Sequence, residues 1–113
     1  MIKAELVLEG GLLKSCVISG HAGAGPKGAD IVCAAVSVLA RTAFQALSAR
    51  DGISARGEFP ERGEFSLEVL KISAENREFL AGVGTFLVQG LLSVSKEYPE
   101  FCKVCIKERQ NGS

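Results

Sequence analysis

The side chains best suited to chemistry in this chain are its single histidine, His21, and the cysteine Cys33. His21 follows a segment of alternating polarity, and Cys33 lies early in a long apolar segment. A thiol paired with an imidazole can act as a nucleophile with its base. On residue pattern alone, a buried core cysteine and a structural histidine are the commoner arrangement. The two residues are therefore a candidate pair, and their proximity depends on the fold.

The segment around Cys33 predicts a helix that begins at Asp30, where the carboxylate can accept a backbone N–H of the first turn. Cys33 would then lie about three residues into the helix, where free N–H groups favour a thiolate. Asp30 opposes this effect with its own negative charge, so activation of the thiol must depend on His21. Ser37, one helical turn later, can hydrogen-bond toward the thiol or simply fill a tight contact between helix and sheet.

A glycine-rich loop is predicted between these residues, from Gly20 to Gly28. Residues 23–28 match the dinucleotide-binding pattern G-x-G-x-x-G. The context argues against a nucleotide: the loop follows a predicted antiparallel hairpin, Pro26 has no N–H to offer a phosphate, and Asp30 would repel one. A loop that closes over a peptide fits these residues better.

Zinc binding and redox chemistry are two further interpretations of the cysteines. Cys102 and Cys105 have metal-ligand spacing, and His21 with Cys33 would complete four ligands. Two residues three positions apart on a strand point to opposite faces of the sheet, however, and redox motifs normally stand at a helix start. We expect Cys102, Cys105 and also Cys16 to be ordinary structural residues, with no metal and no cofactor.

The pattern of apolar residues predicts an α+β domain over residues 1–113, with a mostly antiparallel sheet of about five strands and two helices. Gly10 and Gly11 predict a hairpin turn, and Pro60–Gly63 predicts a second turn. The expected order is strand, strand, helix, strand, strand, helix, strand. The approximate ranges are strands 2–9 and 12–19, a helix from 30 to about 50, a hairpin over 53–72, a helix from 74 or 75 to 95, and a strand over 101–107.

Each predicted helix carries an apolar stripe. In the first helix the stripe is Ile31, Ala35, Leu39, Ala43 and Leu47, and this helix should be mostly buried. In the second helix the stripe is wider and comprises Phe79, Leu80, Val83, Phe86, Leu87, Gly90, Leu91 and Val94.

The composition restricts the classes of partner that the protein can bind through charge. Thirteen basic residues balance thirteen acidic ones among the 113, which argues against an electrostatic grip on nucleic acid or on an anionic membrane. The N-terminus lacks the apolar core of a signal peptide, and Arg41, Gln45, Arg77 and Gln89 interrupt the longest apolar runs. We expect a cytoplasmic protein, no membrane span, and four reduced cysteines.

Residues 20–37 carry a resemblance to a known family. The chain is similar to the ribosomal-processing cysteine proteases, the Prp family, at Gly20-His21-Ala22, at Gly28 to Ala34 with Asp-Ile-Val-Cys-Ala, and at Ser37. The separation of the two motifs also agrees. Outside this stretch the agreement is in length and order of elements.

The resemblance implies a small homodimeric α+β protease that removes the N-terminal extension of large-subunit ribosomal protein twenty-seven, cutting after an aromatic residue. His21 and Cys33 would be the catalytic dyad. Residues expected to support them or to bind substrate are Gly20, Ala22, Gly23, Gly25, Gly28, Asp30 and Ser37. A competing hypothesis from another class is a non-enzymatic, ribosome-associated module that clamps a peptide with the same loop.

Overall fold

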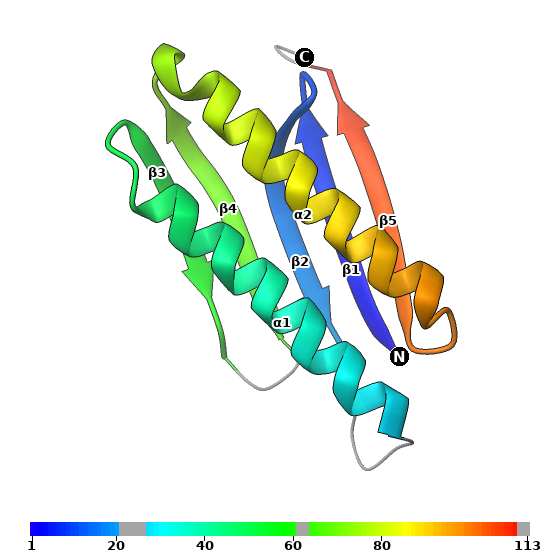
Figure 1. The fold of residues 1–113 in the computed structure, drawn as a ribbon. Helices are drawn as coiled ribbons and strands as arrows, with labels where there is room; N and C mark the ends of the chain where they lie inside the picture. The colour runs from blue at the N-terminus through cyan, green and yellow to red at the C-terminus, as the bar shows by residue number, and fades with distance from the viewer. Residues whose placement is uncertain (21–26, 61–63, 111–113) are drawn as a thin grey trace.

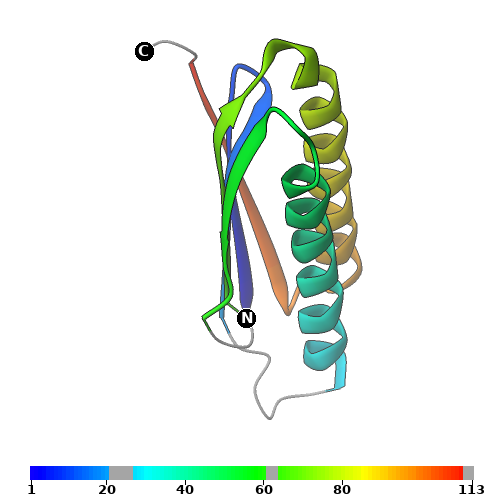
Figure 2. The same cartoon turned by 90° about the vertical axis from the view of Figure 1, so that its left-hand side faces the viewer.

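Five strands form one sheet, and two long helices cover one of its faces (Figures 1 and 2). The computed structural model describes residues 1–20, 27–60 and 64–110. The elements are β1 (Ile2–Glu9), β2 (Leu12–Ser19), α1 (Lys27–Ser48), β3 (Ile53–Glu58), β4 (Phe65–Ile72), the short 3₁₀ helix η1 (Ala74–Asn76), α2 (Arg77–Glu97) and β5 (Cys102–Arg109). The predicted α+β class and order of elements are confirmed.

Two antiparallel hairpins build most of the sheet. β1 and β2 pair from Lys3 opposite Ser19 to Glu9 opposite Leu12, and Gly10 and Gly11 make the turn with φ of 59° and 81°. β3 pairs with β4, which also pairs antiparallel with β2. Both predicted hairpins are confirmed, whereas residues 61–63 of the predicted Pro60–Gly63 turn lie outside the described residues.

The last strand makes the sheet mixed. β5 lies parallel to β1 with Ile2 opposite Cys102 and Glu9 opposite Arg109, so the strand order is β3-β4-β2-β1-β5. Tyr98 caps the C-terminus of α2, and the backbone N–H groups of Phe101 and Cys102 both donate to the Tyr98 carbonyl. This tight turn brings the chain back at the end of the sheet where β1 begins, so β5 must run alongside β1 in the same direction (Figure 1).

α1 begins earlier than the sequence predicts. Lys27 and Gly28 are already helical, so the predicted loop from Gly20 to Gly28 is too long at its C-terminal end. Asp30 is an exposed residue of the first turn and not the cap from which the helix starts. Cys33 therefore lies in the second turn of α1, about 9 Å along the axis from Lys27.

The buried face of α1 also differs from the predicted stripe. Val32, Val36, Ala40, Ala43 and Leu47 are buried, while Ile31 is 54% exposed and Ala35 and Leu39 are half-buried. The predicted residues are spaced by four, and such a row drifts around a helix by about 160° over sixteen residues. The row therefore starts on the outer face and reaches the core only at its C-terminal end, and α1 is not mostly buried.

The wide stripe predicted for α2 divides into two parts. Leu80, Leu87 and Leu91 are buried against the sheet, together with Gly84. Gly90 faces α1, because a Cβ built on it would lie 2.8 Å from Leu39 Cδ2. Phe79, Val83 and Val94 are half-buried and Phe86 is 73% exposed.

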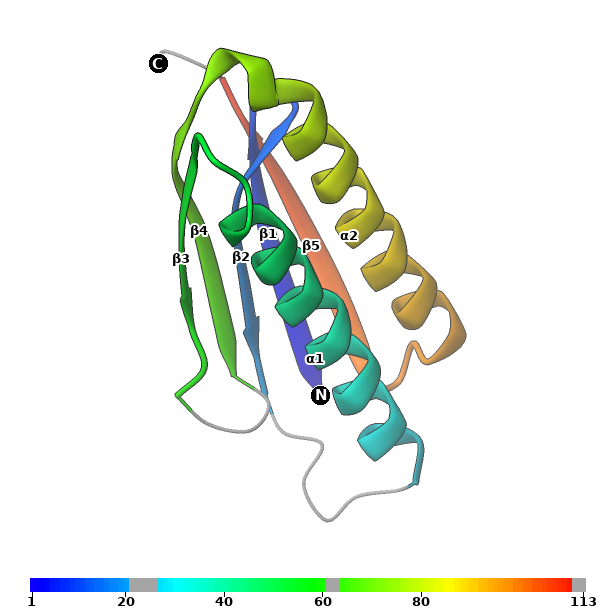
Figure 3. The same ribbon diagram turned by 60° about the vertical axis from the view of Figure 1, so that its left-hand side comes forward.

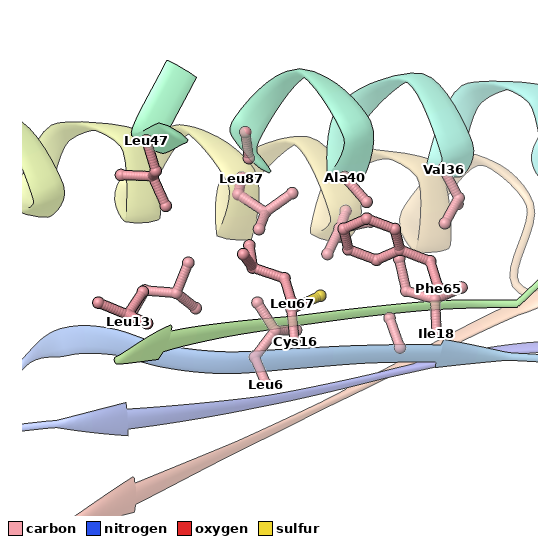
Figure 4. Close-up of a cluster of buried hydrophobic side chains, with 14 of the residues drawn as sticks. Leu6, Leu13, Cys16, Ile18, Val36, Ala40, Leu47, Phe65, Leu67 and Leu87 are labelled. Carbon is pink, nitrogen blue, oxygen red and sulfur yellow. The ribbon is translucent and has the colours of Figure 1, made fainter. Parts of the chain in front are cut away.

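The core lies between the helices and the helix-facing side of the sheet (Figure 4). Side chains from α1 and α2 pack onto every second residue of the strands, because successive strand residues point to opposite faces of the sheet. The residues that Figure 4 labels are Val36, Ala40, Leu47 and Leu87 from the helices and Leu6, Leu13, Cys16, Ile18, Phe65 and Leu67 from the strands.

Both helices are long and apolar enough to cross a membrane by length and composition alone, over Asp30–Ser48 and Ala74–Glu97. The interruptions by Arg41, Gln45, Arg77 and Gln89 do not take the two helices below this threshold, and the absence of a membrane span stays a prediction. Each helix packs one face on the sheet (Figure 2), as helices of a packed core do. Only 33% and 22% of the two segments are buried, so much apolar helix surface faces outward.

A buried asparagine joins the two helix–strand junctions at one end of the molecule. Asn76 is 2% exposed. Its Oδ1 accepts hydrogen bonds from Arg50 Nε and Nη2, and its Nδ2 donates to the Asp51 carbonyl and to Ser73 Oγ at 2.7 and 2.8 Å. The end of α1 and the start of α2 are thereby fixed to each other.

Replacing Asn76 by leucine should destabilise the fold by about 2–4 kcal/mol, because the Asp51 carbonyl, Ser73 and Arg50 all lose a buried partner. Urea unfolding of the Asn76→Leu variant measures this loss. Gln89→Leu is the matched control, since Gln89 is exposed on α2. Equal stability of Asn76→Leu and the wild type would show that the cluster does not stabilise the fold.

Candidate functional site

The strand that precedes His21 and the helix that carries Cys33 reach the same end of the molecule. β2 ends at Ser19 beside the N-terminus, and α1 begins at the same end (Figure 3). His21, Ala22, Gly23 and Gly25 lie outside the described residues, so their predicted roles stay predictions. Gly20, which precedes these residues, and α1, which follows them, are both described.

Gly20 fixes how the chain leaves β2 toward His21. Its φ is +109°, a conformation that side-chain-bearing residues rarely adopt. A Cβ at this position would also overlap the carbonyl oxygen of Met1 and lie 3.3 Å from Ile2 Cα. Only glycine fits here, so the predicted supporting role of Gly20 has a structural reason: it sets the backbone direction one residue before the candidate base.

Cys33 lies on a defined flank of α1. It is 5% exposed but is not part of the core cluster, which takes in Val32 and Val36. Successive helical residues are rotated by about 100°, so Cys33 is turned about 60° from the middle of the buried stripe. Leu39 is turned by the same angle in the opposite direction and contacts α2 at Gly90. Cys33 is therefore on the flank that faces away from α2.

The β3–β4 side of the sheet lies next to this flank. Phe44, also on it, packs on Gly57 of β3 and makes an edge contact with Phe59, with ring centroids 5.9 Å apart. Phe59 in turn contacts Phe65, the first residue of β4, with ring centroids 4.8 Å apart. We call this side of α1 the Cys33 flank. It looks toward the ends of β3 and β4, next to the end of β2 that leads to His21.

Of the supporting residues predicted on α1, only one lies beside Cys33 on the same flank, and the other two lie in the first turn of the helix. Ser37 is half-buried one turn beyond Cys33, on the same flank, as predicted. Asp30 is exposed in the first turn and Gly28 is the second residue of the helix. The free N–H groups of a helix belong to its first four residues. They lie a full turn before Cys33, which disfavours the predicted stabilisation of a thiolate by the helix start.

One contact of the Cys33 flank was not predicted from the sequence. Arg41, two turns after Cys33, lies over the Phe59 ring at 5.6 Å from its centroid. Phe59 itself is 44% exposed. The spacing of Cys33, Ser37 and Arg41 by four residues could have placed Arg41 on this side of the helix, but nothing in the sequence placed Phe59 beside Arg41.

The remaining three cysteines have different surroundings. Burial raises the pKa of the Cys16 thiol to about 12 and also raises the pKa of Cys102. Cys16 and Cys102 belong to the core, and Cys105 is half-buried on the opposite face of β5 from Cys102. Within residues 1–20, 27–60 and 64–110, no three His, Cys, Asp or Glu side chains gather as metal ligands would. The opposite orientation of Cys102 and Cys105 argues against a zinc site.

The strand before the G-x-G-x-x-G pattern is β2, which pairs antiparallel with both of its neighbours. Dinucleotide-binding sites of this pattern work in parallel sheets. The fold therefore contains the antiparallel hairpin whose prediction argued against nucleotide binding.

Known proteins resemble the chain in sequence and in fold. Residues 1–103 match the family described as cysteine protease Prp, and no curated protein matches at a significant level. The structure of SMU.848 from Streptococcus mutans has a TM-score of 0.79 at 29% identity and covers 96% of both chains.

Two structures of an essential ribosomal processing protease Prp from S. aureus have the same fold. The complex with a substrate peptide has a TM-score of 0.79 at 19% identity. The complex with a covalently linked product peptide has a TM-score of 0.77 at 21% identity. Each covers 95% of this chain and 100% of the other.

Replacing Gly20 by alanine should destabilise the protein by more than the ~1–2 kcal/mol that an L-residue costs at positive φ, because its Cβ also overlaps the Met1 carbonyl. Gly11→Ala is the matched control, since Gly11 has φ +81° but a Cβ built on it would meet no atom within 4 Å. Thermal unfolding compares the two. A Gly20→Ala variant no less stable than Gly11→Ala would contradict the close approach of Met1.

Proposed function

Because the chain belongs to the cysteine protease Prp family, we propose that it is an endopeptidase that removes the N-terminal extension of large-subunit ribosomal protein twenty-seven with a Cys33–His21 dyad. The observation that carries the proposal is the place of Cys33. The thiol lies on the flank of α1 that faces away from α2, and α1 begins at the end of the molecule where β2 ends, two residues before His21.

The chemistry of the dyad follows from the two side chains. His21 takes the thiol proton, and the Cys33 sulfur attacks the scissile carbonyl carbon. The tetrahedral intermediate collapses, the peptide C–N bond breaks, and the protonated imidazole gives its proton to the leaving amine. Water, deprotonated by His21, then hydrolyses the thioester and releases the acid. No metal or cofactor takes part in this scheme.

A peptide substrate is supported by the relatives. The S. aureus protease of the same fold was crystallised with a substrate peptide and with a covalently linked product peptide. A thioester between Cys33 and the acyl half of a peptide would be the corresponding covalent species in this chain. The apolar and aromatic surroundings of the Cys33 flank suit a peptide cut after an aromatic residue.

We also propose that the protein works in the cytoplasm as a homodimer, as the family resemblance implies. Ribosomal proteins are made and assembled in the cytoplasm, so a trimming enzyme would meet its substrate there. The same resemblance supports the pairing of two copies.

Incubation with the ribosomal protein that bears the extension should yield a product shortened at one bond, detected by mass spectrometry. Cys33→Ser should lower the rate by at least about 1,000-fold, because the hydroxyl is a far weaker nucleophile in a site built for a thiol. Cys105→Ser is the matched control and should trim normally. Trimming by Cys33→Ser at the wild-type rate would contradict the proposal. Binding of the precursor by wild-type protein without cleavage would favour the non-enzymatic peptide clamp.

Iodoacetamide near neutral pH should label Cys33 before the other three cysteines. Cys16 and Cys102 should stay unlabelled in the folded protein, because burial raises the pKa of both thiols. Peptide mapping after short exposure measures the order, and His21→Ala should slow only the labelling of Cys33. Equal rates for Cys33 and Cys105 would show that Cys33 is not activated.

A further inference from the structure

The sheet divides between β2 and β4 at the end of the molecule where α2 begins (Figure 1). The ladder between these two strands ends at Ser15 opposite Glu68, although both strands continue, β2 along β1 and β4 along β3. Among the described residues, the facing backbone edges of 12–14 and 69–72 therefore have no strand partner. Buried backbone N–H and C=O groups are otherwise almost always paired, so this gap is a specific feature of the sheet.

Two β-bulges mark the point of division. Lys14 is the extra residue in β2, since the register of β1 with β2 skips it. Leu70 is the extra residue in β4, since the register of β3 with β4 skips it in the same way. If the ladder between β2 and β4 continued, Lys14 would face Val69 and Leu13 would face Leu70. Both bulges thus lie just beyond the last pair, where bulges can end a ladder and redirect a side chain.

The side chain that is redirected is that of Lys14. Its Nζ donates to the Val69 carbonyl at 2.8 Å and takes the place of a backbone donor in the gap. An ammonium group has three N–H donors, and this hydrogen bond uses one of them. Among the described residues, no carboxylate forms an ion pair with Lys14. The half-buried ammonium therefore retains donors for a ligand.

A hollow of about 190 Å³ lies beside this ammonium. We call it the bulge slot. Its apolar walls include Leu13 and Val69 of the strands and Leu80 of α2, all of which are buried. Lys71 and Arg77 also line it, and both are exposed. The bulge slot thus combines buried apolar walls with a positively charged opening.

Positive charge prevails around the bulge slot. Glu9 is the one carboxylate among the described residues that line it, and its Oε2 lies 3.3 Å from Arg109 Nη2. Neither Lys71 nor Arg77 forms an ion pair with another described residue. Like charges that share one hollow repel each other. An anion in the slot would relieve this repulsion and attract all three cations.

The walls and the charge together select the class of ligand. A bare phosphate ion would satisfy the cations but leave the apolar walls in contact with water. The volume is sufficient for several waters, which an apolar group can displace favourably. A carboxylate on a short apolar body meets both conditions, because its oxygens accept charge-assisted hydrogen bonds while the body covers the walls.

We propose that the bulge slot binds a carboxylate carried on a short apolar body, with Lys14, Lys71 and Arg77 around the carboxylate. Two sources supply this chemistry: the C-terminal residue of a peptide and a free short-chain acid. The slot is separate from the candidate active site, since Lys14 precedes Gly20 by six residues, or about 20 Å of extended strand. The inference therefore does not rest on the proposed protease activity.

An NMR titration of the isotope-labelled full chain with N-acetyl-L-leucine tests the assignment. The chemical shift changes should concentrate at the amides of residues 12–14 and 69–72, with a Kd on the order of 1 mM. N-acetyl-L-leucinamide, which has the same body without the charge, and inorganic phosphate should each bind at least about 10-fold more weakly. Hexanoate is the second acid: tighter binding of hexanoate assigns a free acid as the source, and tighter binding of N-acetyl-L-leucine assigns a peptide terminus.

The double variant Lys71→Gln/Arg77→Gln should weaken the binding of N-acetyl-L-leucine by about 10-fold or more. Both side chains are exposed, so the fold should be unaffected, whereas Lys14 also holds the Val69 carbonyl. Lys96→Gln is the matched control, because Lys96 is an exposed cation at the other end of α2, and it should bind normally.

Three results would overturn the assignment: shift changes that are absent or spread over the surface, an amide or phosphate that binds as tightly as N-acetyl-L-leucine, or a Lys71→Gln/Arg77→Gln variant that binds like the wild type. Cys33→Ser should bind the acid normally. Failure of the protease proposal would appear as absent trimming with normal binding at the slot, and failure of this assignment as absent binding in a protein that still trims.

Discussion

The structure depends on the burial of one face of the sheet beneath two helices that approach closely. The contact distances are set by residues without side chains. Gly84 lets α2 approach Leu13 of β2, Gly90 receives Leu39 of α1, and Gly57 of β3 receives the ring of Phe44. A Cβ at Gly90 would lie 2.8 Å from Leu39 Cδ2 and a Cβ at Gly57 would lie 2.8 Å from the Phe44 ring, so a larger residue at either position would displace the side chain packed against it. The rotation of α1 about its axis places Leu39 at Gly90 of α2 and Phe44 at Gly57 of β3.

That rotation gives α1 three separate surfaces. The stripe that begins at Val32 packs on the sheet, the flank with Leu39 meets α2, and the flank with Cys33 faces the β3–β4 side. A slip of one residue would turn the helix by about 100° and exchange these surfaces. The core thus determines which way the candidate nucleophile faces, although the thiol lies outside the core cluster.

Local patterns in the sequence were sufficient for the elements and for both hairpins, because alternation and the Gly10-Gly11 turn are properties of neighbouring residues. The parallel pairing of β5 with β1 could not be predicted in this way, since it depends on where α2 delivers the chain. The start of α1 was misplaced because Asp30 suggested a cap, whereas the helix begins three residues earlier at Lys27.

For the site, sequence motifs selected Cys33 and Gly20, and the fold supplied reasons for both positions. The flank itself could not be predicted, because Phe59 and Arg41 come together only when β3 packs against α1. Likewise, the sequence grouped Phe86 with the core leucines of α2. Its hydrophobicity is similar to theirs, but at 100° per residue it is turned by about 100–140° from the three leucines, so the wide predicted stripe spans more of the helix than the sheet covers.

A Cys33 nucleophile that is activated by His21 should be open to covalent capture by a substrate-like peptide. A chloromethyl ketone peptide with the sequence preceding the cleavage site should alkylate the protein once, and peptide mapping should place the adduct on Cys33. In His21→Ala the adduct should form at least about 100-fold more slowly. An adduct on Cys105, or capture at an unchanged rate in His21→Ala, would show that Cys33 is not a nucleophile activated by His21.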